Sequence, residues 1–509
     1  MYRKHLPFGA YAVVFALMLT SCGSGGGDES AAGGQVQEEV TLEFAVQRPP
    51  NSLHPSELHD GEQRFVWGTL FDTLLHIDEA GELHPGAAEE WEYSDDALTL
   101  TLRLREDLSF SDGREVTAED VKGTLDWTRN EPGPQAANLA SIESVEAEDD
   151  RTVVISLSEP DGNLLNALSQ AAGVIGDPES IENPQTQLNP VGTGPYTLNP
   201  DRTQDGVEYV LERRDDHWNV EEYPFTTVTV QAIQDATARY NALLAGQVDA
   251  ATVNGELVEQ AENAGLTVHP AEGATLAQLV LADRQGEVTP ELADTRVRQA
   301  INLALDREGM LQALMYGYGS PTEQLFPPTG DAYLSEAEGA YEHDLEDARR
   351  LMEEAGYSDG FTLAMPATMV SMQFQAALSQ AFSDIGIRLQ WDPVQQQESG
   401  NSGQWSAYWN ISGGAAPSRI VDYYFEPDAT NNPFGTTDPE LDELLEAAAA
   451  ETEPDEVAAL YREISQFGLD EAWFAPVMWI DTMWATTEGI EYTGGGLFPQ
   501  DLKAFGVTG

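Results

Sequence analysis

The sequence is poor in cysteine and in positive charge, and each shortage excludes a class of protein. A single cysteine, Cys22, excludes a disulfide framework, a four-cysteine zinc site and Cys-x-x-Cys redox chemistry. Lysine occurs three times and arginine 21 times, against 88 acidic residues, so the formal net charge is −64. Such a field repels phosphate backbones, which excludes a nucleic-acid partner.

The acidic charge is nevertheless not that of a disordered tail. Hydrophobic residues make up 41% of the chain and ten residues are tryptophan, which is enough to bury large cores. A length of 509 residues predicts two or three domains. The acidity has two interpretations, a solvated surface suited to a salty medium or acidic faces that bind basic substrates. We favour the halotolerant interpretation, because counterions then screen the self-repulsion.

A hydrophobic run long enough to span a membrane is also lacking, but a short one stands near the amino terminus. Arg3 and Lys4 precede the apolar run 8–19, which is shorter than the roughly 20 residues needed to cross a bilayer. A basic start followed by a short apolar run is typical of a signal peptide. The sequence therefore predicts export from the cytoplasm.

The residues after this run predict a lipid anchor. Leu19-Thr-Ser-Cys22 resembles the bacterial lipobox, so residues 1–21 are expected to be cleaved and Cys22 to be acylated. An ordinary signal peptide with a chance cysteine is the alternative. Residues 22–39 begin with a glycine-rich stretch and predict a flexible tether. We expect an extracytoplasmic protein held at the outer face of the cell membrane by its lipid alone.

Hydrophobic periodicity predicts alternating strands and helices along the rest of the chain. Helices are expected to begin after the capping residues Thr117, Asp306, Asp344 and Asp438. The order strand, helix, strand over 361–391 predicts a right-handed α/β crossover. Strands are predicted at 40–46, 98–104, 150–157, 207–213, 226–233, 275–282, 361–365 and 387–391.

Several segments, in order and at matching separations, resemble one family over nearly all of the chain beyond the tether. The family is the dipeptide/oligopeptide/nickel class of extracytoplasmic solute-binding proteins that serve ABC importers, often called family five. The segments that carry the resemblance are 71–75, 81–91, 94–105, 110–113, 117–121, 190–196, 215–218, 242–249, 297–307 and 348–357.

The resemblance implies an α/β, two-lobed periplasmic-binding-protein-like fold (type II, cluster C-like) with an extra α+β subdomain in the first lobe. The chain is expected to cross between the lobes near 280–283 and 479–485. The first lobe's core is then built from 40–60, 190–280 and 485–509, its extra subdomain from 61–189, and the second lobe from 281–484.

The resemblance also implies a function that involves no catalysis. An extended organic solute, peptide-like or other, is enclosed between the lobes and delivered to the permease subunits of an ABC importer. We expect no cofactor and a monomeric protein.

The family's main ligand-contacting strand and loop corresponds to residues 404–414. Tryptophan and tyrosine offer wide apolar contact together with a hydrogen-bonding group. From the residues alone, core filling by these aromatics is the favoured interpretation, whereas the position in the family favours contact with solute. The candidate ligand-binding residues here are Trp405, Tyr408, Trp409, Asn410, Ile411, Ser412 and Gly413.

Three further residues are candidates for contact with solute. Arg419 is suited to a solute carboxylate, although surface arginines are commoner. Asn51 and Ser52 follow the first strand, in a loop that faces the cleft in this family. They either hydrogen-bond to solute or only shape a turn.

The choice of solute stays open between several classes. Family members that bind free peptides usually carry an aspartate in the ligand loop, which holds the α-ammonium group. Here Asn410 follows Trp409, and the next acid is Asp422. An amide does not neutralise a buried ammonium group. Sugars, blocked or cyclic peptides or another organic solute are therefore favoured over short free peptides, with oligosaccharides and nickel complexes as alternatives.

Hydrolases and metal sites receive little support from the motifs. The sequence has no Gly-x-Ser-x-Gly elbow. A carboxylate pair for glycan hydrolysis can be drawn from 88 acids, but no spacing singles one out, so a surface lipoprotein glycan hydrolase is the alternative from another class. The eight histidines form no His-x-x-x-His pair, and we predict no metal site.

Overall fold

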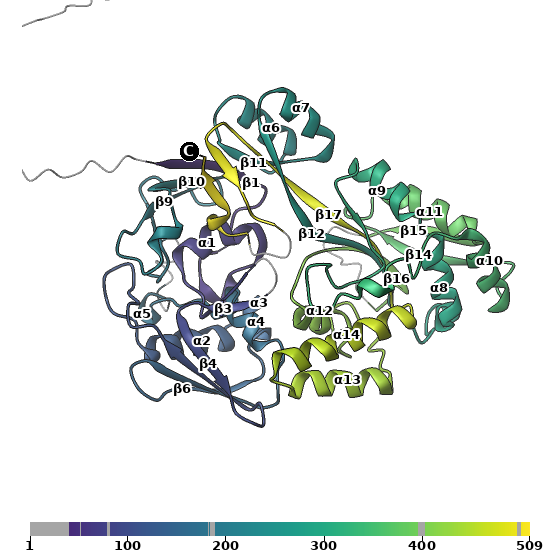
Figure 1. Cartoon of the computed structure of the whole chain (residues 1–509), viewed down its shortest axis with the longest axis horizontal. Coiled ribbons are helices and arrows are strands. Elements are labelled where there is room, and N and C mark those ends of the chain that lie inside the picture. The colour runs from purple at the N-terminus through teal and green to yellow at the C-terminus, as the bar shows by residue number, and fades with distance from the viewer. Residues whose placement is uncertain are drawn as a thin grey trace, which may run out of the picture. The chain divides into compact units, whose positions relative to one another are not determined.

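The structure is a computed structural model that describes residues 40–50, 52–78, 82–181, 183, 189–394, 403–495 and 500–508 (Figure 1). Its fold is mixed α/β in two lobes. Cys22, the tether and Asn51 lie outside the described residues, so the predictions made for them stay predictions.

A nine-stranded sheet forms the centre of the fold. Its order is β16-β12-β17-β11-β1-β10-β9-β8, and β13 pairs with β17 beside this path. Strand β1 runs parallel to both β10 and β11, whereas β12 is antiparallel to both of its neighbours. The strands are β1 (Thr41–Val46), β8 (Tyr196–Leu198), β9 (Glu208–Arg213), β10 (Thr227–Ala232), β11 (Ala250–Val253), β12 (Thr267–Leu281), β13 (Gly319–Pro321), β16 (Ala407–Gly413) and β17 (Phe474–Thr486).

The long strands β12 and β17 link the two lobes, as Figure 1 shows. Their pairing is interrupted between Ala271 and Thr275, where Gly273 has a φ of 65° and its amide donates to Asp481 Oδ1 at 3.0 Å. A glycine is suited to this position because other residues rarely adopt a positive φ. Strand β12 begins at residue 267, eight residues before the predicted start at 275. The prediction missed its first half because Pro270 and Gly273 are typical of turns.

The position of this interruption bears on where the chain crosses between the lobes. Residues 276–282 of the chain are buried in the cores of the second lobe, so the predicted crossing at 280–283 lies inside that lobe. We infer that the chain crosses at 271–275, opposite 480–482 on β17. The second predicted crossing, 479–485, includes that part of β17.

A second sheet with its own core occupies part of the first lobe. The four strands have the order β4-β5-β7-β6, and helix α2 packs against β6 and β7. The predicted capping box of α2 is confirmed: Asp120 Oδ2 accepts from the amide of Thr117 at 2.9 Å. The elements are β4 (Ala88–Tyr93), β5 (Thr99–Leu104), β6 (Ile142–Ala147), β7 (Thr152–Leu157), α2 (Ala118–Asn130), α3 (Pro134–Ala137), α4 (Leu164–Leu168) and α5 (Pro178–Ile181).

The main core of the first lobe joins segments from both ends of the chain. Phe44 of β1 packs against Phe65, Trp484 and Phe505 with ring centroids 5.0–6.2 Å apart. Each of these residues is at most 1% exposed. The other elements of this lobe are α1 (Arg64–Leu70), α6 (Ala236–Leu244), α7 (Val258–Asn263), β2 (Leu75–Ile77), β3 (Leu83–Pro85), β18 (Ile490–Tyr492) and β19 (Phe505–Val507).

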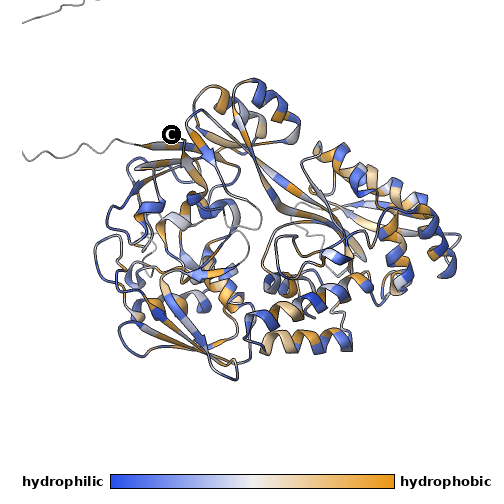
Figure 2. Cartoon of the chain, viewed as in Figure 1, coloured by the Kyte–Doolittle hydropathy of each residue, from blue (hydrophilic) through white to orange (hydrophobic). Residues whose placement is uncertain are grey.

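The second lobe is rich in helices, as predicted. The side chains of Asp306, Asp344 and Asp438 each accept a backbone amide at the start of a helix, which confirms these caps. Strands β14 and β15 pair in parallel, as the order strand, helix, strand requires. Helices α13 and α14 carry both hydrophobic and hydrophilic residues (Figure 2), typical of surface helices. The elements are α8 (Thr295–Ala304), α9 (Arg307–Met315), α10 (Leu345–Glu354), β14 (Phe361–Ala367), α11 (Gln375–Asp384), β15 (Ile387–Pro393), α12 (Pro417–Tyr424), α13 (Pro439–Ala450) and α14 (Pro454–Asp470).

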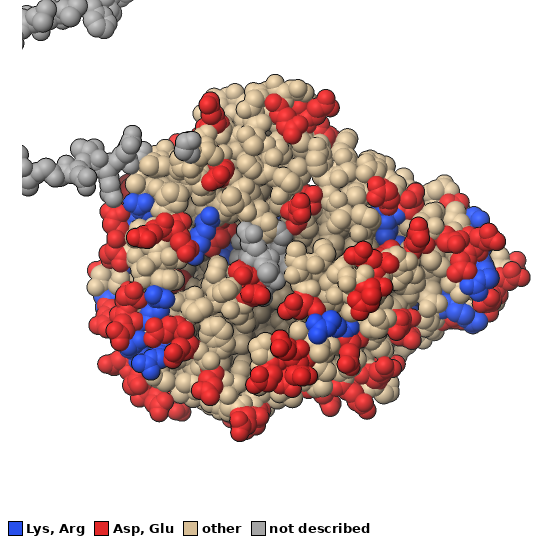
Figure 3. All heavy atoms as spheres, in the orientation of Figure 1, with Lys and Arg blue, Asp and Glu red and all other residues tan. Residues whose placement is uncertain are grey.

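Acidic side chains are spread over the surface, with few cations between them (Figure 3). In the described part of the chain, no helix combines the length and the apolar character needed to cross a membrane.

Candidate functional site

A cavity of about 1230 Å³ lies between residues of the two lobes. Strand β16, helix α12 and the segment 367–372 line it from the second lobe, and β17 lines it through Trp479, Thr482 and Trp484. From the first lobe, the lining residues are Asp60, Gly61, His76, Ile77, Asp78, Asn166, Gln170, Tyr492, Thr493, Gly494, Gly495, Gln500, Asp501, Lys503 and Ala504.

Seven of the ten candidate ligand-binding residues lie on this cavity. Strand β16 is held in place by pairing with β12, in which Tyr408 faces Val280 and Gly413 faces Thr275. The seven residues are Tyr408, Trp409, Asn410, Ile411, Ser412, Gly413 and Arg419. Their contact with a solute stays a prediction.

Tyr408 and Trp409 are also core residues. Each is 2% exposed. The indole of Trp409 lies 4.3 Å from the ring of Phe374, and the Tyr408 hydroxyl donates to Asn431 Oδ1 at 3.0 Å. Core filling is therefore confirmed for both aromatics, which also lie on the cavity wall, and their contact with solute stays a prediction.

Polar groups at the end of β16 form a hydrogen-bonded chain. Asn410 Nδ2 donates to the Tyr424 hydroxyl at 3.0 Å, and that hydroxyl donates to Ser412 Oγ at 2.9 Å. Burial raises the pKa of Tyr424 to about 12, so the phenol stays protonated. The end of β16 therefore offers polar and uncharged groups to the cavity.

Arg419 lies on the cavity but already has several partners. Its Nη1 donates to Asn138 Oδ1 of the first lobe at 2.8 Å and to Asp422 Oδ2 at 3.1 Å. Its Nη2 donates to the Tyr423 hydroxyl at 2.8 Å, and the guanidinium carbon lies 4.2 Å from the centre of that ring. A solute carboxylate would have to compete with these contacts.

Ser52 and Trp405 do not line the cavity. Ser52 Oγ accepts from the amide of His54 at 3.0 Å, which is the turn interaction considered as the alternative to solute contact. Trp405 is half-buried, and its Nε1 has no hydrogen-bond partner in the described part of the chain. Asn51 lies outside the described residues.

Sequence reasoning missed the first-lobe wall and an apolar segment of the second lobe. Met369, Val370 and Met372 line the cavity with large exposed fractions of 70%, 46% and 67%. The sequence could have indicated their exposure. They are apolar residues that follow strand β14 without helical or strand periodicity, and such residues seldom belong to a core. Asp60 and His76 gave no such signal.

His76 on the first-lobe wall lies in an environment that disfavours its own protonated form. Burial, followed by the charge of Lys503, lowers the pKa of His76 to about 4, so this imidazole is neutral at pH 7. Lys503 Nζ pairs with Glu222 Oε2 at 2.6 Å. Asp501 Oδ1 accepts from the amide of Lys503 at 3.1 Å.

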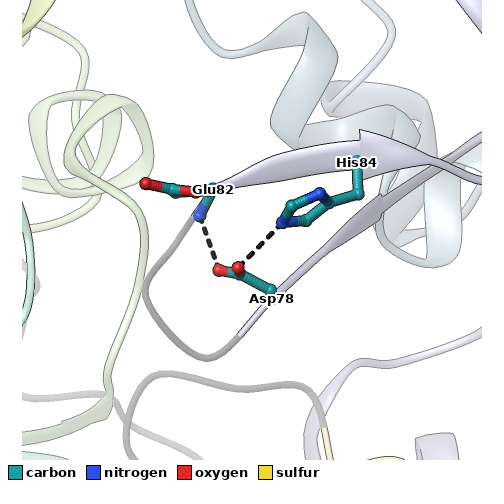
Figure 4. A group of neighbouring side chains, drawn as sticks. All are labelled: Asp78, Glu82 and His84. Atoms are coloured by element: carbon teal, nitrogen blue, oxygen red, sulfur yellow. Dashed lines mark hydrogen bonds and ion pairs between the residues drawn. The ribbon is translucent and has the colours of Figure 1, made fainter.

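Asp78, Glu82 and His84 form a group whose ligand atoms lie within 4.8 Å of one another (Figure 4). Asp78 Oδ2 contacts His84 Nε2 at 2.8 Å, and Asp78 Oδ1 accepts from the amide of Glu82 at 3.0 Å. These contacts join β2 to β3, and both oxygens of Asp78 take part in them. The group is accounted for by the hairpin, and we assign it no metal.

Comparison with known proteins identifies the family. The family model for bacterial extracellular solute-binding proteins, family 5 (middle region), matches residues 82–437. The glutathione-binding protein GsiB of Escherichia coli K12 is 25% identical over 453 residues, which cover 84% of this chain and 86% of GsiB.

Solved structures share the fold at low sequence identity. The periplasmic binding protein DppA of Helicobacter pylori, in complex with the peptide STSA, superimposes with a TM-score of 0.75 at 22% identity and covers 92% of this chain and 98% of its own. NikA of Brucella suis, in complex with Fe(III)-EDTA, has a TM-score of 0.76 at 22% identity and covers 92% and 100%. The chain therefore belongs to the bacterial extracellular solute-binding proteins of family 5, which bind solutes and are not enzymes.

Proposed function

We propose that this protein captures an organic solute in the cavity between its lobes and presents it to the permease of an ABC importer. The observation that carries the proposal is the lining of the cavity, which comes from both lobes and from both long linking strands. Bending at 271–275 and 480–482 would open and close it, and closure couples binding to a shape that a permease can recognise. The glycan hydrolase alternative finds no support in a family of binding proteins.

The lining supports the residues proposed to contact the solute. The half-buried Asn410, Ile411 and Ser412 offer two polar groups and one apolar side chain at the cavity wall. Arg419 links the solute side of α12 to Asn138 of the first lobe, and so contributes to closure. Tyr408 and Trp409 act mainly as the rigid support behind this surface.

The solute class is not given by the relatives, because their printed ligands differ widely. They include glutathione, the peptide STSA and Fe(III)-EDTA. A peptide-like or other organic solute fits a cavity of about 1230 Å³. Oligosaccharides and nickel complexes remain alternatives within the same function.

We further propose that the protein acts as a monomer at the outer face of the cell membrane, held there by a lipid on Cys22. The sequence signals at 8–22 support this anchor. A tethered monomer can approach its permease without leaving the membrane surface.

A screen for thermal stabilisation tests the function. Detergent-solubilised full-length protein is heated with peptides, oligosaccharides, other small organic solutes and nickel complexes, each at a range of concentrations. A ligand at 100 times its Kd stabilises the folded protein by about 2.7 kcal/mol. The same ligand should lose affinity when Ser412 is replaced by Leu, which blocks the cavity wall. Stabilisation by a solute that is chemically converted during the assay would contradict the proposal.

A further inference from the structure

Among the described residues, two cations line the cavity, and each is paired with an acid from outside it. Arg419 Nη1 lies 3.1 Å from Asp422 Oδ2, and Lys503 Nζ lies 2.6 Å from Glu222 Oε2. Neither acid belongs to the lining. A solute carboxylate would therefore have to displace an existing partner from either cation.

Asp60 is a carboxylate on the first-lobe wall of the same cavity. Its Oδ1 accepts from the amide of Ala171 at 3.1 Å, and no ion pair joins it to another described residue. The side chain lines the cavity and remains exposed there. The hydrogen bond from Ala171 engages Oδ1 alone.

Arg64 is the cation with the largest effect on the pKa of Asp60, but it does not form an ion pair with it. Arg64 is 4% exposed, and its Nη1 donates to Ser169 O at 3.2 Å and to Gln170 Oε1 at 3.0 Å. Burial raises the pKa of the Asp60 carboxyl. The charge of Arg64, the hydrogen bond from Ala171 and the charges of Arg419 and His59 offset this only in part. A carboxylate kept in such a place costs stability unless a cation meets it.

Part of the second-lobe wall is apolar. Met369, Val370 and Met372 line the cavity and are 46% to 70% exposed. Methionine adapts its shape to different apolar partners. Trp479 and Trp484 of β17 also line the cavity, although each is only 1% exposed.

From this distribution we infer that the cavity selects a solute with a positively charged nitrogen on an apolar body, and that Asp60 receives the nitrogen. The inference rests on the proposed solute-binding function. A primary ammonium or a guanidinium group would make a charge-assisted hydrogen bond to the carboxylate of Asp60. The carboxylate missing next to Asn410 is thus supplied from the opposite lobe, which readmits free amines, including peptides, as solutes.

Matched probes test the charge requirement. The tripeptide amide Ala-Phe-Leu-NH₂ carries one positive charge, its N-acetyl amide none, and its N-acetyl acid one negative charge. A simple amine, 4-phenylbutylamine, separates a general preference for ammonium groups from a preference for peptides. We expect the two cationic probes to bind to the full-length protein in calorimetry, and the anionic probe to bind at least about 10-fold more weakly than the cationic tripeptide.

Substitution of Asp60 tests the assigned residue. D60N keeps the acceptor for Ala171 and removes the charge, so we expect the cationic tripeptide to lose about 10- to 100-fold in affinity, while the neutral probe is unchanged. Asp359, an exposed residue beyond α10 and far from the lining, provides the matched control, because D359N removes the same charge from the molecule's overall field. An equal effect of D359N and D60N would overturn the inference.

The melting temperature of the unliganded protein is a second measurement that does not depend on binding. D60N should leave the melting temperature of the unliganded protein equal or higher at pH 7, because it removes a carboxylate whose charged form burial disfavours. Unfolding of D60N at lower temperature would show that Asp60 serves the fold, and would overturn the assignment. Equal binding of neutral and cationic probes, or failure of both cationic probes at millimolar concentration, would also overturn it. Solute capture itself would survive if any other solute stabilised the protein and lost affinity in S412L.

Discussion

Protonation of Glu426 is expected to stabilise this protein as the pH falls from 8 to 5. The side chain follows α12 and is half-buried. Burial, reinforced by neighbouring carboxylates, raises its pKa from 4.5 to about 7. Those neighbours are Asp428, Asp422, Asp442 and, from the first lobe, Glu159.

The magnitude follows from the size of the shift. The pKa is higher in the folded state than in the unfolded state, so the contribution to stability is complete below pH 4.5 and is lost as the pH rises through about 7. At 1.36 kcal/mol per pKa unit, the full shift corresponds to ~3.4 kcal/mol. Because Glu426 is partly exposed and salt screens its neighbours, we expect about 1–2 kcal/mol in practice.

Urea denaturation of the wild type and of E426Q at pH 5 and pH 8 measures this effect. E426Q should exceed the wild type by about 1–2 kcal/mol at pH 8 and by clearly less at pH 5. E463Q, a change of an exposed residue on α14, serves as the control and should show no such dependence on pH. A difference between E426Q and the wild type that is the same at both pH values would refute the reasoning.

Three further predictions concern the cavity, the surface and the anchor. Trp409→Ala should lower the free energy of unfolding by about 3–5 kcal/mol in chemical denaturation, since it empties a packed site, whereas Met372→Ser should change it by less than about 0.5 kcal/mol and weaken binding of solutes with an apolar body. If the acidic surface is an adaptation to salt, the melting temperature should rise between 0.1 M and 2 M NaCl, and an unchanged value would contradict that interpretation. Cys22→Ser should abolish labelling by radioactive palmitate and release the protein from the membrane fraction, and persistent labelling would place the lipid elsewhere.

Local patterns were reliable wherever the interaction was itself local. The caps at Asp306, Asp344 and Asp438 are hydrogen bonds to amides two or three residues further on, so the sequence contains both partners side by side. Strand β5, predicted at 98–104, alternates because one of its faces is buried. The predicted strand at 275–282 is shorter than β12 because the bulge in β12 contains a glycine. In the sequence, such a glycine indicates a turn.

Only the second-lobe wall of the candidate site could be predicted from the sequence. Strand β16 could be placed through the family resemblance, and seven of the ten candidates lie on the cavity. Burial of Trp409 at 2% exposure could not be read from the sequence, because an aromatic residue suits a core and a ligand wall equally. The same ambiguity makes Trp409→Ala a poor test of binding, and a change at an exposed cavity residue such as Met372 a better one.

The sequence by itself determined the family, the mixed α/β character, the signals for export and the excess of acid, because all of these are properties of composition and of neighbours along the chain. Only the tertiary structure decided which charges meet. Asp60, Met372, Arg419 and Lys503 are far apart in the sequence, yet they surround one cavity. Whether a carboxylate there forms an ion pair within the protein depends on distances of a few ångströms. Electrostatic interactions weaken with separation and are stronger where the groups are buried. Those distances are set by the packing of the two lobes, which no local pattern records.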